Sequence, residues 1–508
     1  MAISRARSKQ IIKASMLAIN NWVTGCCLLA FIRSMVVRAN MRILIILLLL
    51  LLPAAGARGA TIGEITQWVA DGHWQAARQA IVRELARTNL DFQARDALLF
   101  QQDRLTRIRL DFGKTRAQVL AQVRALAPGM TEEQFDRWDK SGALESLNID
   151  GKRWYFNSAA RNLFLISPPA RALAGTNIPA DELFGLDDVR SVIADFDKTG
   201  GRRHQPRTWE ITYRLSVKPD MVPAGETIRA WLPLAHTDGR QQNIRVVSTD
   251  PPRFIRSDTN DALSSLYLEK PSLGHQPTEF KIIYDLTTEA FFEPIDPARV
   301  RPADASDPAL VPFLGEEPPH IVFANNIRQL ERQIVGAETN SYLQARRLFA
   351  WTSSHITWAN AREYSTLDCL PQYALAAGHG DCGIKTMTFM TLCRCAGIPA
   401  RWESGWTTEP VKDMHDWCEI YLAPYGWVPV DVTYGLTGSA DEREQWFYLG
   451  GIDGKRFFVN TDYAQPLFPA KTFYRSEIVD FQRGEVEWRG GNLYFNQWKY
   501  DFDAREMR

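Results

Sequence analysis

A cysteine, a histidine and an aspartate in the last third of the chain have the residue types and the order that acyl-transfer chemistry requires. Cys382 lies in GHGDCGIKT, His415 begins HDWCEIYL, and Asp431 follows in GWVPVDVT. A thiol becomes a strong nucleophile when a neighbouring imidazole removes its proton, and an acid on the far ring nitrogen fixes the orientation of that imidazole. The sequence therefore predicts Cys382 as the nucleophile, His415 as the general base and acid, and Asp431 as the orienting acid of one site.

The element that must position Cys382 is a helix. Three glycines surround Cys382 where a loop is expected to become helical, and Gly397 and Pro399 mark the end of that helix. The unpaired N–H groups and the dipole of a helix N-terminus favour an anion. We therefore expect a lowered pKa for the Cys382 thiol, and backbone N–H groups that donate to a developing oxyanion.

The elements that must position His415 and Asp431 are two strands. Polar and apolar residues alternate from His415 onwards, a turn follows at residues 423–426, and a second strand covers residues 427–432. An antiparallel hairpin places both residues at one edge of a sheet. Simple counting across the turn offsets them by about three residues, which a bulge or a shifted loop would have to absorb.

Composition and charge describe a globular chain of several domains. Hydrophobic residues make up 45% and charged residues 23% of the 508 residues, and 59 Lys and Arg balance 59 Asp and Glu. The length predicts about three domains. The zero formal net charge gives no electrostatic reason to expect nucleic acid as a partner.

The N-terminal segment is typical of a secretory signal. The first forty residues contain no acidic residue, and Met41 and Arg42 precede the apolar run 43–52 and the small-residue stretch AAGARGA. This order predicts a presequence over residues 1–60, with Met41 as the start and cleavage after Ala57 or Ala60. The apolar run is shorter than the roughly 20 residues that span a bilayer. We expect a periplasmic or secreted protein that contacts membrane only if the signal segment stays uncleaved.

Apolar periodicity predicts the remaining organisation. Apolar residues recur at three- and four-residue intervals after residue 60, and the pattern changes to strict alternation from residue 208. Prolines then become frequent, and a mixed region of helices and strands follows. We expect four segments: a helical domain with one hairpin at 61–205, an immunoglobulin-like β-sandwich at 206–295, a proline-rich linker at 296–319, and a catalytic domain with C-terminal strands at 320–508.

The cysteines do not indicate a disulfide scaffold or a metal site. Downstream of the presequence the chain has an odd number of them, so at least one thiol is unpaired. A pairing of Cys369 with Cys418 stays open. Zinc sites favour C-x-x-C pairs, whereas this chain has only the C-x-C of residues 393–395. We expect neither a metal nor a cofactor.

Four segments together resemble the transglutaminase-like superfamily: GDCGIKT, LCRCAGIPARW, HDWCEIYL and YGWVPVDVT. In that family a helix that starts at a cysteine recurs with the blocks R-x-x-GIPAR, H-x-W-x-E and GW-x-x-x-D. The resemblance covers roughly residues 340–460. It implies an α+β fold, with a papain-like catalytic domain preceded here by the β-sandwich and the helical domain, and it implies the catalytic roles given above for Cys382, His415 and Asp431.

The resemblance also implies an oxyanion donor upstream of the nucleophile. In the family an upstream Trp, Tyr or Gln completes the oxyanion hole, and Trp358, Tyr364 and Gln372 are the candidates in this chain. The sequence does not choose among the three.

Several reactions are open to such a site, because the thioester formed by thiolate attack can pass to water or to an amine. The chain looks like exported bacterial members, so we expect a peptidase or amidase that hydrolyses peptide or isopeptide bonds, with cell-envelope peptides as a candidate substrate. One alternative is a transferase that joins glutamine side chains to amines, which a water-excluding channel formed by Trp406, Trp417 and Trp427 would favour. The other is a non-catalytic binding module, which a buried or oxidised Cys382 would indicate.

Overall fold

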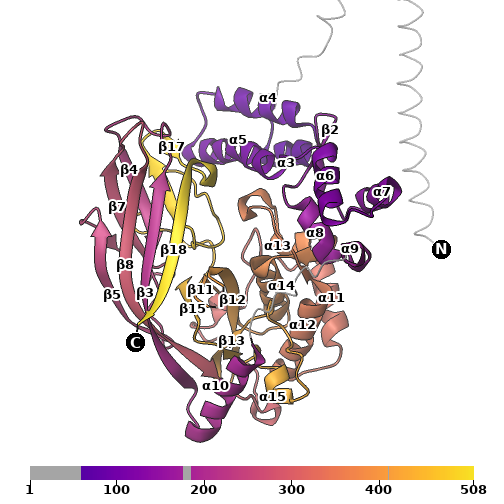
Figure 1. The fold of residues 1–508 in the computed structure, drawn as a ribbon, viewed down its shortest axis with the longest axis vertical. Coiled ribbons are helices and arrows are strands. Elements are labelled where there is room, and N and C mark those ends of the chain that lie inside the picture. The colour runs from indigo at the N-terminus through magenta and orange to yellow at the C-terminus, as the bar shows by residue number, and fades with distance from the viewer. Residues whose placement is uncertain (1–58, 175–184, 410, 508) are drawn as a thin grey trace, which may run out of the picture. The chain divides into compact units, whose positions relative to one another are not determined.

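The computed structural model describes residues 59–174, 185–409 and 411–507. The chain divides into two units, Met1–Thr61 and Ile62–Arg508, and Figure 1 shows the elements of the second. The expected signal segment, with Met41 and the cleavage position after Ala57, lies outside the described residues. Within the described ranges, no helix is both long and apolar enough to cross a membrane.

The segment after residue 60 is helical because its apolar residues fall on one face of each helix. Ile65, Trp74, Ala77 and Ile81 are all buried. Thr131 and Gln134 form a capping box that starts a helix. The elements are α3 (Ile62–Ala70), α4 (Trp74–Leu85), α5 (Phe92–Asp111), α6 (Arg116–Leu126), α7 (Glu132–Lys140), the antiparallel hairpin β1 (Ser146–Ile149) and β2 (Lys152–Tyr155), α8 (Ala159–Ile166), α9 (Pro168–Leu173) and α10 (Leu186–Thr199).

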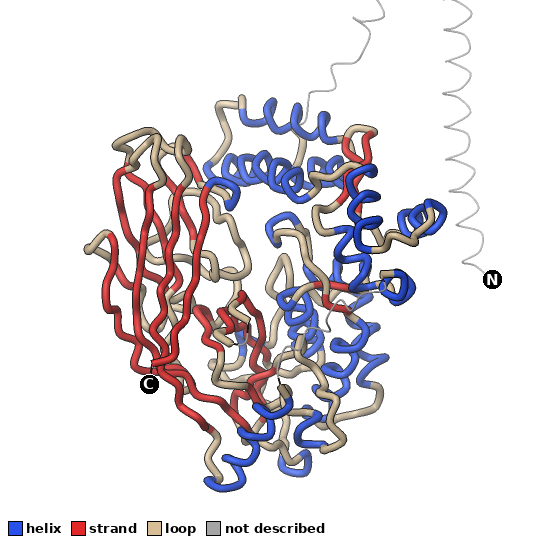
Figure 2. The backbone as a smooth tube through the Cα atoms, viewed as in Figure 1, coloured by secondary structure: helices blue, strands red, loops and turns tan. Residues whose placement is uncertain are grey.

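Two five-stranded sheets form a β-sandwich, visible as the long red strands in Figure 2. Alternation buries one face of each strand, as in β3, where Trp209, Ile211 and Tyr213 belong to the core between the sheets. One sheet has the order β14-β8-β3-β18, with β5 also paired to β8, and the other has the order β17-β16-β4-β7-β6. The first six of these strands along the chain are β3 (Arg203–Val217), β4 (Thr227–Pro233), β5 (Gln241–Asp250), β6 (Ile255–Arg256), β7 (Ser265–Pro271) and β8 (Thr278–Phe292).

The C-terminal strands are hydrogen-bonded to the strands of the sandwich. This differs from the assignment of residues 320–508 to one domain, which implied that these strands extend the sheet of that domain. Strand β18 (Trp498–Met507) pairs with β3 along its whole length, and β16 (Glu485–Trp488) pairs with β4 and with β17 (Gly491–Asn492). Chain order alone suggested the earlier grouping. Pairing between strands far apart in sequence covers the edge that β3 would otherwise leave open.

The described part of the chain after residue 320, the candidate catalytic region, is α+β, with the helices α11 to α15 and a four-stranded antiparallel sheet of order β13-β12-β11-β15. Helix α14 is the central one, since nearly all its residues are buried. A short parallel bridge joins β9 (Thr357–Trp358) to β10 (His379–Gly380). The other elements are α11 (Asn325–Val335), α12 (Ser341–His355), α13 (Leu370–Ala377), α14 (Cys382–Cys395), β11 (Ala400–Thr407), β12 (Asp413–Leu422), β13 (Gly426–Val430), α15 (Glu442–Gln445), β14 (Gly451–Ile452) and β15 (Arg456–Asn460).

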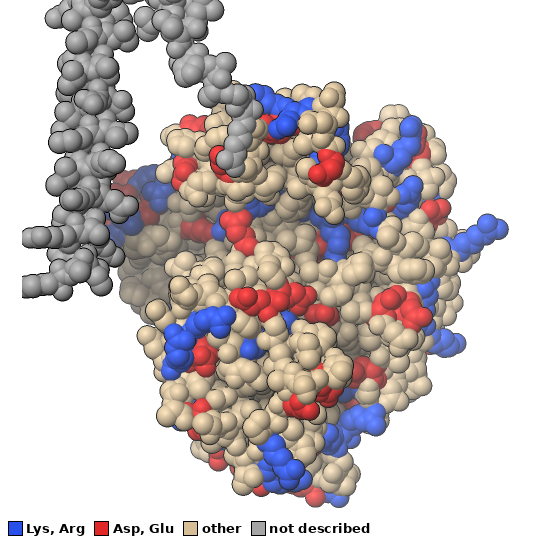
Figure 3. All heavy atoms as spheres, turned by 180° about the vertical axis from the view of Figure 1, so that it is seen from behind, with Lys and Arg blue, Asp and Glu red and all other residues tan. Residues whose placement is uncertain are grey.

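The proline-rich segment 296–319 lies against the catalytic region. Its two short 3-10 turns are η1 (Pro297–Arg299) and η2 (Val311–Phe313). Arg301 N donates to Ala423 O in the β12–β13 turn, and Glu317 forms an ion pair with Arg394 of α14. On the face drawn in Figure 3, acidic and basic side chains are interspersed, as the equal totals of the two charges suggest.

Candidate active site

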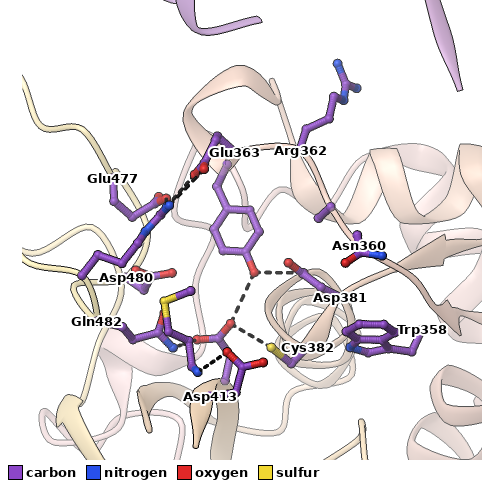
Figure 4. A pocket seen from close by; sticks show the side chains of 15 residues that line it. Trp358, Asn360, Arg362, Glu363, Asp381, Cys382, Asp413, Glu477, Asp480 and Gln482 are labelled. Atoms are coloured by element: carbon purple, nitrogen blue, oxygen red, sulfur yellow. Dashed lines mark hydrogen bonds and ion pairs between the residues drawn. The ribbon is translucent and has the colours of Figure 1, made fainter. Parts of the chain in front are cut away.

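Cys382 is the first residue of helix α14, as the sequence predicted. Asp381 caps this helix, and its Oδ1 accepts a hydrogen bond from Ile384 N at 3.1 Å. The β9–β10 bridge pairs Gly380 with Trp358 just before the cap. The indole of Trp358 therefore lies beside Cys382 (Figure 4).

His415 and Asp431 meet across the β12–β13 hairpin. Cys418 pairs with Val430, so Asp431, one residue past β13, lies opposite Trp417 and diagonal to His415 on the same face. His415 Nε2 is 2.7 Å from Asp431 Oδ2. The register runs without interruption to the turn, so the bulge that simple counting seemed to require is not needed.

A buried arginine holds Asp431 in its ionised form. Arg456 of β15 places Nη1 2.5 Å from Asp431 Oδ2, and Thr433 N and Tyr434 N donate to Oδ1. Burial alone would raise the pKa of Asp431, but His415 and Arg456 outweigh it and lower that pKa to about 2. Asp453 forms a second ion pair with Arg456. The sequence analysis missed Arg456, because it stands in the apolar strand RFFVN with no local signal of its partner.

A second carboxyl group contacts the nucleophile. Cys382 Sγ lies 3.3 Å from Oδ2 of Asp416, the residue after His415. Gln482 Nε2 donates to Asp416 Oδ1 at 2.8 Å and to the His415 carbonyl at 3.0 Å. The sequence analysis missed Asp416 and Gln482, and the only available signal was the position of Asp416 inside the H-x-W-x-E block.

The pKa of the Cys382 thiol is raised, and the expectation of a lowered value is wrong for this site. Burial is the largest cause, followed by the charges of Asp416 and Asp381. The first turn of α14 offers less to a thiolate than expected, because Asp381 already accepts the hydrogen bond of Ile384 N. The buried Lys385 interacts electrostatically with both Cys382 and Asp431, and burial lowers its own pKa to about 8.

Cys382 opens into a cavity of about 230 Å³. The walls come from the loop 358–364, the start of α14, the start of β12 and the segment 477–483 (Figure 4). Two of the three oxyanion candidates, Trp358 and Tyr364, line this cavity. The third, Gln372, does not, and instead exchanges hydrogen bonds with Asn326 in an exposed position.

A glycine permits the close packing at the start of α14. A Cβ on Gly383 would collide with the Tyr364 hydroxyl and would lie 2.7 Å from Asp416 Oδ2. The Tyr364 hydroxyl donates to Asp381 Oδ1 at 2.9 Å and lies 3.3 Å from Asp416 Oδ2. The glycine after the nucleophile therefore lets a tyrosine and an aspartate approach the helix together.

Helix α5 of the N-terminal region supports two walls of the cavity. Arg107 donates to the carbonyls of Ser476 and Arg475 at 2.9 and 3.0 Å. Asp111 Oδ2 accepts from Glu363 N at 3.1 Å, and Arg104 donates to the Thr366 carbonyl at 2.9 Å. These contacts give the N-terminal helical region a supporting role at the cavity.

The other cysteines take no part in this arrangement. All five cysteines in the described ranges are free thiols, so Cys369 and Cys418 do not pair and Cys382 is not oxidised. Cys393 and Cys418 are buried in the core. Within the same ranges, no group of three or more His, Cys, Asp or Glu side chains is placed to hold a metal ion.

The region around these residues is similar to a known protein family. Residues 328–432 match the family model of the transglutaminase-like superfamily. A curated relative, the uncharacterized protein YebA of Bacillus subtilis, is 31% identical over 88 residues, which cover 14% of this chain and 12% of YebA. The match thus spans a small part of that relative's length.

Solved structures are more distant. A proposed cysteine protease from Cytophaga hutchinsonii is 13% identical with a TM-score of 0.41, covering 60% of this chain and 92% of that one. The periplasmic domain of TgpA from Pseudomonas aeruginosa is 15% identical with a TM-score of 0.24, covering 44% and 88%. The match to the transglutaminase-like superfamily over residues 328–432 thus contains Cys382, His415 and Asp431.

Proposed function

We propose that this protein is an exported cysteine hydrolase that cleaves peptide or isopeptide bonds through a thioester, with cell-envelope peptides as its substrate class. The observation that carries the proposal is that a free Cys382 opens into the cavity at the start of α14, while β12, which packs against α14, carries His415 hydrogen-bonded to the ionised Asp431. Nucleophile, base and orienting acid are then supplied by one region of the chain.

The reaction follows from the roles of these groups. His415 takes the proton of Cys382 Sγ, and the thiolate attacks the substrate carbonyl. Because Nε2 is bonded to Asp431, Nδ1 is the nitrogen that exchanges this proton. The C–N bond then breaks, the amine leaves with the proton from His415, and a water deprotonated by His415 hydrolyses the thioester.

Trp358 is the best-supported donor to the oxyanion. Its indole lines the cavity next to Cys382, and it comes from the strand that pairs with residues 379–380. The hydroxyl of Tyr364 instead points at Asp381. We therefore assign the stabilisation of the developing charge to Trp358 Nε1 together with backbone N–H groups at the start of α14.

The walls of the cavity favour water over an amine as acceptor. They carry six carboxyl groups, and the tryptophans that could have formed an apolar channel lie elsewhere: Trp406 stacks on Phe502, Trp417 is fully buried and donates to Glu403, and Trp427 packs on Arg401. A polar cavity admits water to the thioester, which supports hydrolysis.

The test is an assay of the full chain on peptides that contain a peptide or an isopeptide bond, with a labelled amine present. We expect release of the new amino group with no incorporation of the label, and no release with Cys382→Ala. Incorporation of the labelled amine would show a transferase instead. Peptide binding without turnover in the unaltered chain would show a binding module.

A further inference from the structure

Asp416 touches the reacting sulphur, yet the reaction proposed above makes no use of it. Its Oδ2 is 3.3 Å from Cys382 Sγ, and its side chain lines the cavity while being only 2% exposed. In Figure 4, Cys382, Asp381 and Gln482 lie around this carboxyl group. A buried carboxyl group in contact with a nucleophile affects it differently in its two protonation states.

The hydrogen bonds show which oxygen of Asp416 can carry a proton. Oδ1 accepts from the Gln482 amide at 2.8 Å, so it acts as an acceptor. The Tyr364 hydroxyl has a single proton and lies 2.9 Å from Asp381 Oδ1 and 3.3 Å from Asp416 Oδ2, so when it donates to the nearer Asp381 its oxygen can accept a hydrogen bond from a protonated Asp416. We therefore assign the proton of the neutral form to Oδ2, which faces both the Tyr364 oxygen and Cys382 Sγ.

The surroundings of Asp416 favour its neutral form. The ionisable groups that face it are Cys382 and Asp381 from α14, Tyr364 from the loop before α13, and Glu477 and Asp480 from the segment 477–483. The nearest arginine of that segment, Arg483, pairs with Glu363 and Glu477. Burial, followed by the charge of Asp381, raises the pKa of Asp416 well above its usual range.

We propose that Asp416 is a further catalytic residue: as a carboxylic acid it donates a hydrogen bond from Oδ2 to the Cys382 thiolate, and as a carboxylate it accepts the S–H and keeps the sulphur protonated. This inference rests on the proposed function, because it concerns the same nucleophile. It adds an upper pH limit to the reaction that the triad does not impose.

The protons balance in both states. In the acid state, the S–H bond of Cys382 breaks and an N–H bond forms on His415, while Asp416 keeps its proton and stabilises the sulphur anion. In the carboxylate state, ionisation of the thiol would place two negative charges 3.3 Å apart in a buried site. The thiolate is therefore favoured only while Asp416 is protonated.

The experiment measures the rate of Cys382 alkylation by iodoacetamide from pH 5 to pH 10 in the full chain, with each cysteine followed by peptide mass spectrometry. In the unaltered protein we expect the rate to rise with pH and then to fall about tenfold on the alkaline side. Asp416→Asn keeps a neutral donor of the same shape, so its rate should rise and stay level to pH 10. Asp501→Asn, at an exposed position of β18, is the matched control and should behave as the unaltered protein.

Two results would overturn the inference. One is an unaltered protein whose rate stays level to pH 10, a measurement that needs no variant to fold. The other is an Asp416→Asn profile that coincides with that of the unaltered protein. His415→Ala separates this outcome from failure of the proposed function: if it slows alkylation while Asp416→Asn changes nothing, only the role of Asp416 is wrong, whereas no effect of His415→Ala contradicts the catalytic pair itself.

Discussion

Two buried aspartates lie close to His415, and their surroundings favour the ionised form of one and the neutral form of the other. Asp431, on the far side of His415, contacts Arg456 and two backbone N–H groups, and its pKa falls to about 2. Asp416, on the side of the nucleophile, contacts a thiol, a tyrosine and an amide, and its pKa is raised. Both are removed from solvent. The comparison shows that the partners of a buried carboxyl group, more than its burial, decide whether it serves as an anion or as an acid.

The largest expected effect comes from neutralising each aspartate in turn. Asp431→Asn should lower kcat by about 10⁴-fold, because the amide no longer stabilises the imidazolium or fixes its tautomer. Asp416→Asn should retain kcat within about tenfold near pH 7, since an amide resembles a neutral acid. Steady-state kinetics on the peptide substrate measures both, with Asp501→Asn as the control. Equal losses in the two variants would show that both groups act as anions.

Removal of the cation beside Asp431 is expected to have the next largest effect. Arg456→Ala leaves a buried carboxylate without its charged partner and should lower the free energy of unfolding by about 3–5 kcal/mol. Arg505→Ala removes an exposed arginine of β18 that pairs with Glu210, and it should change the free energy of unfolding by less than about 1 kcal/mol. Urea unfolding gives both values. Similar values for the two variants would mean that Arg456 does not hold the charge of Asp431.

The smallest effect is the pH dependence of stability, which should have opposite signs for the two residues. The lowered pKa of Asp431 contributes stability that is complete above the unfolded value of 3.8 and is lost as pH falls toward about 2, amounting to about 2 kcal/mol. The raised pKa of Asp416 means that stability declines as pH rises above the unfolded value, so Asp416→Asn should be more stable than the unaltered protein near pH 8. Urea unfolding at pH 3, 5 and 8 tests both signs, and a shift in the same direction for Asp431→Asn and Asp416→Asn would refute the comparison.

The sequence predicted what local patterns encode. Helix α14 starts at Cys382 and the hairpin carries His415 and Asp431 to one edge, because glycines, turn residues and alternation act over a few positions. The groups that determine charge were not predictable in this way. Arg456 reaches Asp431 from another strand, and Gln482 reaches Asp416 from a segment more than sixty residues further along the chain.

The protonation of the nucleophile shows the limit of local reasoning most directly. A thiol at a helix start suggested a lowered pKa, since the helix dipole acts through the first turn. Burial, followed by the charges of Asp416 and Asp381, raises the pKa of Cys382 instead, and the contact with Asp416 depends on the packing of β12 against α14. The pairing of β16–β18 with the sandwich was unpredictable for the same reason. Pairing between strands far apart in the chain cannot be recognised from the sequence of one strand.

The placement of the segment 477–483 between the catalytic sheet and strand β16 has a consequence for the order of events during synthesis. Cys382, His415 and Asp431 all leave the ribosome before Gln482, which holds Asp416, and before β18, which fastens this part of the chain along β3. A nascent chain that already contains these three residues still lacks one wall of the cavity. A chain cut short after Asp431 would therefore present Cys382 without the segment that completes its surroundings.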